Sequence, residues 1–138
     1  MTFEPLEIQG VIADEVGHPR NDGTPGCGLY RVPVRLSRRV GHDEAQYLTQ
    51  LWDHPPQFTT RHRPGIAQVS GDVFTLDGTT VEEVRDVHAR TLAVIVARFN
   101  EEVPKLVAQQ EAREERAREE RDAHDRNVAD VAGYIRFE

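Results

Sequence analysis

The first part of the chain alternates hydrophobic and polar positions as half-buried strands do. Leu6, Ile8, Gly10 and Ile12 alternate with Glu7, Gln9, Val11 and Ala13, and this period of two predicts a strand. Glycine and proline are frequent over residues 17–28, which predicts a loop. A second strand is expected over residues 30–36. Since Pro33 cannot donate to a ladder, this strand should lie at a sheet edge, or at least have that N–H side free.

Further along, the hydrophobic period changes to that of a helix. Residues 42–52 carry an apolar stripe that ends at Trp52, and Pro55 and Pro56 follow. This pattern predicts a helix that ends before the prolines. The pair Gly71-Asp72 suits a two-residue hairpin turn. A turn there would place Val69 opposite Phe74 and Ala67 opposite Leu76, with all four side chains on one face.

A second, longer helix is predicted to start after Thr79 and Thr80. Each threonine is followed three residues later by a glutamate, Glu82 or Glu83, which predicts two overlapping capping boxes. The apolar stripe then continues beyond Ile95, with His88 in the same row. At Pro104 the helix either kinks, or ends and restarts.

The C-terminal part combines a charged segment with an apolar end. Residues 109–127 hold no large apolar side chain, and their five-residue repeat does not favour a long heptad coiled coil. The last residues become apolar again, which predicts that they dock on a sheet edge, on a second copy or on another protein. The candidate interaction residues are Val128, Val131, Tyr134, Ile135 and Phe137.

These elements predict an α+β fold. Two β-hairpins form an antiparallel sheet with helices on one face, in the order ββαββα, and a long charged helix follows. The expected division is an α+β head over residues 1–103, a charged helical extension over 104–127 and an apolar terminal arm over 128–138.

Composition narrows the class of protein. The chain has 138 residues and a formal net charge of -7, so general binding to nucleic acid is unlikely unless basic groups cluster. A single cysteine excludes an internal disulfide and a thiolate zinc site. No apolar run reaches the roughly 20 residues that span a bilayer, and the N-terminus lacks the pattern of a signal peptide. We therefore expect a cytoplasmic protein without a membrane segment, a metal or a cofactor.

The densest group of polar residues lies in the connection after the first helix. Its candidate catalytic residues are Asp53, His54 and His62, and its candidate ligand-binding residues are Arg61 and Arg63. Such side chains could bind a phosphate or a carboxylate, or move protons. The competing interpretation is a surface loop that prolines make rigid, with Trp52 and Phe58 packed beneath it.

This connection also carries a resemblance. Trp52-Asp53-His54-Pro55-Pro56, then His62-Arg63-Pro64-Gly65, then Asp77-Gly78-Thr79-Thr80 resemble a pattern in a group of short uncharacterised bacterial proteins. The resemblance covers about residues 30–88. It implies kinship and no activity.

Three further features each have a functional and a structural interpretation. His88 could be a buried acid or base, although a histidine in an apolar row is usually part of the core. Cys27 lies between two glycines near His18, but nothing fixes that pair for catalysis. Arginines at 31, 35, 38 and 39 could bind phosphates, although a solvated sheet face explains them as well.

The leading hypothesis is a non-enzymatic module that self-associates or binds a partner protein through its C-terminal arm. The first alternative is a small enzyme or ligand-binding protein that uses the Asp53–Arg63 loop. The second is a nucleic-acid binder that uses the Arg31–Arg39 face. The sequence does not decide whether the protein is an enzyme.

Overall fold

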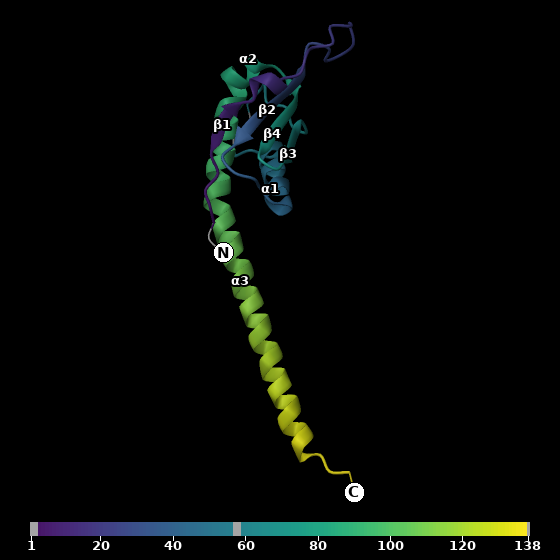
Figure 1. The fold of residues 1–138 in the computed structure, drawn as a ribbon, viewed down its shortest axis with the longest axis vertical. Helices are drawn as coiled ribbons and strands as arrows, with labels where there is room; N and C mark the ends of the chain where they lie inside the picture. The colour runs from purple at the N-terminus through teal and green to yellow at the C-terminus, as the bar shows by residue number, and fades with distance from the viewer. Residues whose placement is uncertain (1–2, 57–58, 138) are drawn as a thin grey trace. The chain divides into compact units, whose positions relative to one another are not determined.

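The computed structural model describes residues 3–56 and 59–137, and it confirms the α+β class and the predicted order of the main elements (Figure 1). A short 3-10 turn, η1, precedes the second strand, and the long helix begins with a short α segment and a π segment, η2. The bounds are β1 Ile8–Val11, η1 Ala13–Glu15, β2 Tyr30–Leu36, α1 His42–Asp53, β3 Ala67–Ser70, β4 Val73–Thr79, α2 Val81–Glu83, η2 Val84–His88 and α3 Ala89–Tyr134.

The four strands form one antiparallel sheet in the order β1-β2-β4-β3. The β3–β4 hairpin has the predicted register, with Val69 opposite Phe74 and Ala67 opposite Leu76. Gly71 makes the turn possible because its φ is 62°, a conformation that side chains with a Cβ rarely adopt. Strand β4 continues through Gly78 to Thr79.

Of the two arrangements expected for the strand that contains Pro33, the edge position is wrong, whereas the N–H side of Pro33 does lie where the pairing with β1 ends. Strand β2 lies inside the sheet, between β1 and β4. The Pro33 carbonyl accepts a hydrogen bond of 2.9 Å from the Ile12 amide, so the proline nitrogen faces the β1 side of the strand. β1 ends at Val11, one residue before Ile12. The Ile12 carbonyl is the group that would have needed a hydrogen bond from an N–H at position 33. An interior strand therefore tolerates the proline because its neighbour stops there.

One face of the sheet carries the core of the first unit. Val32, Val34 and Leu36 on β2 are buried, as are Phe74 and Leu76 on β4. Helix α1 packs against this face, since the rings of Trp52 and Phe74 lie 6.1 Å apart. Helix α3 lies beside α1, since the rings of Tyr47 and Phe99 lie 6.3 Å apart. The expectation of helices on one face is confirmed.

Asn100 fixes the N-terminal segment to the first unit. Its side-chain oxygen accepts from the Leu6 amide at 2.7 Å, and its side-chain nitrogen donates to the Leu6 carbonyl at 2.8 Å. Both polar groups of Leu6 are thus satisfied although its side chain is buried. This clamp holds the strip of chain that leads into β1.

The chain divides into two compact units, Met1–Glu102 and Val103–Glu138. Helix α3 includes Pro104 without an interruption, which answers the question that the sequence left open. In the second unit, residues 105–134 are helical and exposed all round. No core of its own holds this helix, so local propensity and charge pairs must support it.

Candidate functional site

Arg63, Thr79 and His88 converge on the carboxylate of Glu83, in the first turn of the long helix. Arg63 donates to Glu83 through Nε at 2.6 Å and through a terminal nitrogen at 3.0 Å. The Thr79 hydroxyl donates at 2.7 Å, and His88 Nε2 lies 2.9 Å from the same carboxylate oxygen as Arg63 Nε. Four donors from three different parts of the chain therefore meet on one side chain.

The π segment η2 explains how His88 reaches Glu83. In a regular α-helix two residues five positions apart point in different directions. In η2 the Ala89 amide bonds the Val84 carbonyl, five residues earlier, which widens the turn. Positions 83 and 88 then lie on the same side of the helix. No feature of the sequence predicts the π-helical turn.

The same network changes the predicted cap of the helix. Thr80 accepts from the Glu83 amide at 3.0 Å, and the helix starts at Val81 as predicted. The Glu83 carboxylate does not return to the Thr80 backbone, and Thr79 donates to Glu83 rather than capping Glu82. The predicted box at Thr79 is therefore wrong, and the box at Thr80 keeps only the half in which Thr80 accepts from the Glu83 amide. A bidentate arginine binds a carboxylate more strongly than a neutral amide does.

The connection after α1 is fastened at two further points. The Trp52 indole donates to the Arg63 carbonyl at 2.8 Å, and His62 Nε2 donates to the Trp52 carbonyl at 2.7 Å. The Trp52 and His62 rings pack with centroids 4.6 Å apart. The Asp53 carboxylate accepts from the Gly65 amide at 2.8 Å. These contacts join the later part of the connection, residues 62–65, to the last residues of helix α1.

The charges of the cluster are set by these contacts. Hydrogen bonds from Arg63, more than any other cause, lower the pKa of Glu83 to about 2, and the same contact raises the pKa of Arg63. Burial lowers the pKa of His88 against the opposing effect of Glu83. At neutral pH the cluster thus holds an ionised Glu83, a charged Arg63 and a neutral His88.

His88 has the orientation of a general base but not the access. A carboxylate only accepts, so the proton of the neutral ring sits on Nε2 and leaves Nδ1 with a lone pair. Nδ1 has no hydrogen-bond partner within the described part of the chain, and the side chain of His88 is 0% exposed. A substrate cannot reach a base that is sealed in this way. The geometry supports a structural cluster.

The structure brings some of the candidate residues together and leaves others apart. Asp53, His62, Arg63 and His88 make the contacts described above, and all four act on the protein's own groups. His54 and Arg61 are exposed and do not join the cluster. Phe58, the expected packing plug, lies outside the described residues. Glu83 was considered only as a capping residue, and no spacing in the sequence could have identified its central role.

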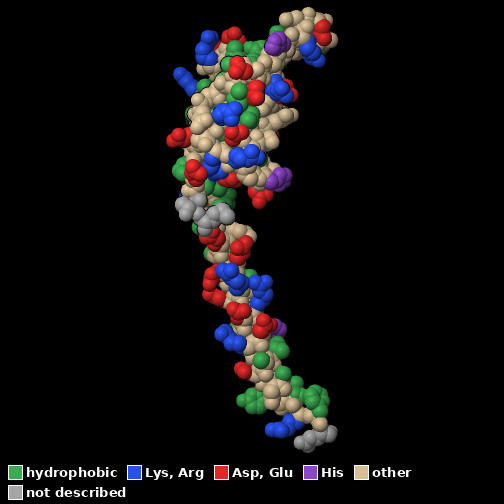
Figure 2. All heavy atoms as spheres, in the orientation of Figure 1, with side chains coloured by type: hydrophobic (Ala, Val, Ile, Leu, Met, Phe, Trp, Pro, Cys, Tyr) green, Lys and Arg blue, Asp and Glu red, His purple; other side chains and the backbone are tan. Residues whose placement is uncertain are grey.

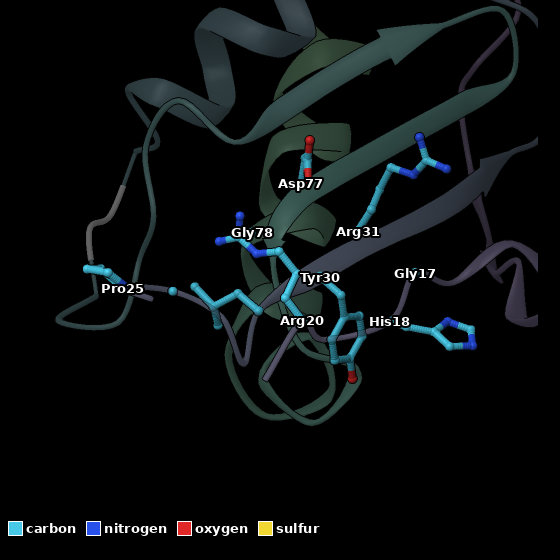
Figure 3. A pocket seen from close by; sticks show the side chains of 10 residues that line it. Gly17, His18, Arg20, Pro25, Tyr30, Arg31, Asp77 and Gly78 are labelled. Carbon is cyan, nitrogen blue, oxygen red and sulfur yellow. The ribbon is translucent and has the colours of Figure 1, made fainter. Parts of the chain in front are cut away.

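A hollow that the sequence did not indicate lies where the 17–29 loop meets the sheet (Figure 3). It has a volume of about 540 Å³, and its lining includes His18, Arg20, Tyr30, Arg31 and Asp77. The Tyr30 hydroxyl accepts from the Val81 amide at 3.0 Å. Nothing in the residue types or spacings predicted this hollow, because it depends on how the loop folds back onto β2.

The basic face at residues 31–39 is partly neutralised. Arg35 pairs with Asp72 at 2.8 Å, and Arg38 pairs with Glu44 at 2.7 Å. Arg31 and Arg39 are exposed. The backbone carbonyl of Cys27 accepts two hydrogen bonds, from the amides at positions 20 and 21, which hold the 17–29 loop together. Two paired arginines leave a smaller cationic surface than the sequence suggested.

The second unit presents its apolar residues to solvent. Figure 2 shows hydrophobic side chains gathered near the C-terminal end of the helix. Their exposed fractions are 49% for Val128, 52% for Val131, 84% for Tyr134, 52% for Ile135 and 95% for Phe137. Every predicted interaction residue is thus exposed within this unit. Leu106 and Val107, which the sequence analysis did not single out, are 48% and 37% exposed.

Within residues 3–56 and 59–137, no three histidine, cysteine, aspartate or glutamate side chains gather in a way that could hold a metal ion. In the same described ranges, no helix has the length and apolar character needed to cross a bilayer.

Comparison of the chain with known protein families, with curated proteins and with solved structures finds no match.

Proposed function

We propose that the protein is a non-enzymatic interaction module that self-associates through its C-terminal segment, residues 104–138. The observation that carries this proposal is the group of large apolar side chains at 128–137, each about half exposed or more. Burying one such side chain completely is worth about 1.5–3 kcal/mol. Several of them beyond a charged helix form a surface that gains free energy when a partner covers it.

The isolated state of the helix supports the same proposal. Residues 105–134 are exposed on every side, and a helix in water without a packed face is only marginally stable. Local contacts such as that of Arg118 with Glu115 at 3.0 Å support this helix, and each contributes a few tenths of a kcal/mol. Pairing with a second helix would supply the missing packed face.

The two alternatives have weaker support. The polar groups of the Asp53–Arg63 loop bond to the protein itself, which favours a role in stability. Arg35 and Arg38 are neutralised by carboxylates, which weakens the case for phosphate binding. The hollow beside Arg31 keeps a small-ligand function open to test by binding of inorganic phosphate.

The test is the mass in solution, by light scattering after size exclusion, of the full chain and of a chain that stops at Asn127. We expect a full-length dimer and a truncated monomer. The fluorescence of buried Trp52 reports whether the first unit stays folded. A full-length monomer at every accessible concentration would end the proposal.

A matched pair of substitutions separates the surface from the helix itself. Val128→Asp places a charge on the apolar surface, whereas Ala129→Asp places the same charge on an exposed neighbour. Ala129→Asp carries the larger cost in helix propensity, because alanine is the best helix former whereas valine and aspartate are about equal. Only Val128→Asp should dissociate the dimer, and equal dissociation by both would assign the effect to a loss of helix.

A further inference from the structure

The two edges of the sheet differ in how well they can accept another strand. At one edge, the register of β1 shifts between Ile8 and Gly10, and Gly10 has a φ of 140°. Such an irregularity interrupts the row of backbone groups. At the other edge, β3 pairs with β4 in an unbroken register, and its sequence from Ala67 to Ser70 holds no charge and no proline. Apart from its shortness, β3 lacks the features that usually prevent an edge from pairing.

The backbone polar groups of Val69 face this edge. The Asp77 amide donates to the Ile66 carbonyl at 2.9 Å. Hydrogen-bonded positions alternate along an antiparallel strand, so Gln68 and Ser70 are the next residues that bond to β4. The N–H and C=O groups of Val69 therefore point away from β4. In the part of the chain that the structure describes, neither group takes part in a backbone hydrogen bond outside the sheet.

A groove lies beside this edge, between β3 and helix α1, which are neighbours in the fold (Figure 1). It has a volume of about 380 Å³. Its lining holds no carboxylate, arginine or lysine and consists of His42, Ala45, Gln46, Thr49, Gln50 and Val69. Side chains of a strand alternate between the two faces of a sheet. A strand added to β3 would therefore place every second side chain in the groove, which favours apolar side chains there.

The terminal segment, residues 134–137, has the pattern of such a strand. Helix α3 ends at Tyr134, and residues 135–137 belong to no helix or strand. In an extended segment, Ile135 and Phe137 share one face, while Tyr134 and Arg136 share the other. Ile135 and Phe137 are 52% and 95% exposed. Both side chains therefore have apolar surface to bury on the same side of the segment.

We propose that residues 134–137 of one copy add as a further strand to the β3 edge of a second copy. The two apolar side chains of the segment then enter the groove beside α1, and its backbone bonds the free groups of Val69. Val128 and Val131 lie within two helical turns before this segment, so they can cover the surface of the same copy. This inference rests on the proposed self-association and names the surface that receives the C-terminal segment.

Charge and coverage favour this occupant of the edge. Residues 1–102 contain ten basic and fifteen acidic side chains, so this unit repels an acidic segment. The segment 134–137 carries one charge, the positive charge of Arg136. Two β3 edges could also pair with each other, but that contact would leave the apolar side chains of the segment in solvent. The segment of a second copy satisfies the edge and covers its own exposed surface in one contact.

Lysine at the edge tests the acceptor strand. Val69→Lys introduces a side chain with which natural proteins block sheet edges, and it should weaken the full-length dimer about tenfold or more. Val11→Lys makes the same change on β1, where Val11 is 41% exposed, and should leave the dissociation constant unchanged. The fluorescence of Trp52 shows whether each variant is folded. Equal dissociation constants for the two folded variants would overturn the choice of edge.

Cross-linking locates the contact without a change at Val69. Two full-length chains, both with Cys27→Ser, are co-expressed, and one carries Gln68→Cys while the other carries Arg136→Cys. In the proposed pair both positions lie on the outer face of the sheet, within about 8 Å of each other. A short bis-maleimide should therefore link the two chains. In the control, Gln9→Cys on β1, also exposed, replaces Gln68→Cys and should give no link.

The other outcomes of this experiment overturn the contact. Linking of the Gln68→Cys chain with itself would show that two β3 edges pair. A control with Gln9→Cys that links as efficiently would place the segment elsewhere. Absence of the link in a chain that light scattering shows to be a dimer refutes only the docking on β3. A wild-type chain that stays monomeric refutes the proposed self-association and this contact together.

Discussion

Glu83 gathers four hydrogen-bond donors, and its replacement by glutamine should be among the most costly changes in the first unit. The contacts lower the pKa of Glu83 from an ordinary 4.5 to about 2. Each pKa unit corresponds to about 1.4 kcal/mol, so the ionised carboxylate contributes on the order of 3 kcal/mol as an upper limit. The Arg63 side chain is 40% exposed, and solvent screening reduces its share. We expect a loss of about 2 kcal/mol at neutral pH.

The pH dependence gives this prediction a signature. The folded-state pKa of Glu83 lies below its unfolded-state value, so the stabilisation is complete above about pH 4.5. It is lost as the pH falls from there toward 2. The Glu83→Gln variant has no such contribution. The difference in unfolding free energy between wild type and variant should therefore shrink across this range.

Urea unfolding followed by the fluorescence of Trp52 measures this difference. Trp52 is the only tryptophan, it is buried, and its indole bonds the backbone of Arg63. Glu82→Gln removes the same charge from an exposed neighbour and serves as the control. A Glu83→Gln variant as stable as this control, or a deficit independent of pH, would refute the reasoning.

Three other substitutions test the contacts around this cluster and the N-terminal clamp. Because burial lowers the pKa of His88, the unfolded chain binds a proton that the folded chain resists. Stability should thus fall as the pH drops below about 6.5, and urea titrations of His88→Gln should lack that fall. Asn100→Ala leaves the polar groups of Leu6 without their partners, and its thermal unfolding should show a loss of about 1–3 kcal/mol. His62→Ala should lower the melting temperature and exposed His54→Ala should not; an equal drop for both would contradict the role given to His62.

Local patterns predicted the elements whose signals lie within a few residues. The hairpin at Gly71 was predicted with its register because turn chemistry and side-chain alternation agree there. The helix start was predicted because Thr80 can reach the Glu83 amide without any help from distant residues. His88 was placed correctly in the buried row of its helix, since the helical period fixes which face it shares.

Contacts between distant residues could not be predicted in the same way. The clamp between Leu6 and Asn100 joins residues 94 positions apart, and an asparagine in a helix carries no sign of such a partner. Pro33 suggested an edge strand because the rule considers one strand at a time. Whether Pro33 fits inside the sheet depends on where the neighbouring strand β1 ends, and the sequence of β2 alone does not contain that information.

The candidate site was only partly predictable for a related reason. The sequence showed that Asp53, His62 and Arg63 share one connection, but their chemistry depends on which groups they meet. Arg63 meets Glu83, and His88 reaches the same carboxylate only because η2 is a π-helix. No residue preference marks a widened helical turn. The sequence therefore could not show whether the charged loop is a catalytic site or a set of contacts that stabilises the fold.

The two units differ in how far their apolar and charged side chains are covered by the rest of the chain. In the first unit, apolar side chains fill a core and the most perturbed ionisable group, Glu83, is fully engaged by neighbours of its own chain. In the second unit, large apolar side chains over residues 128–137 stay exposed. A perturbed group marks a functional site only when a ligand can reach it, and the Glu83 cluster is closed. Exposed apolar surface, by contrast, has free energy to gain from a partner, which is why the search for the function should begin at the C-terminal helix.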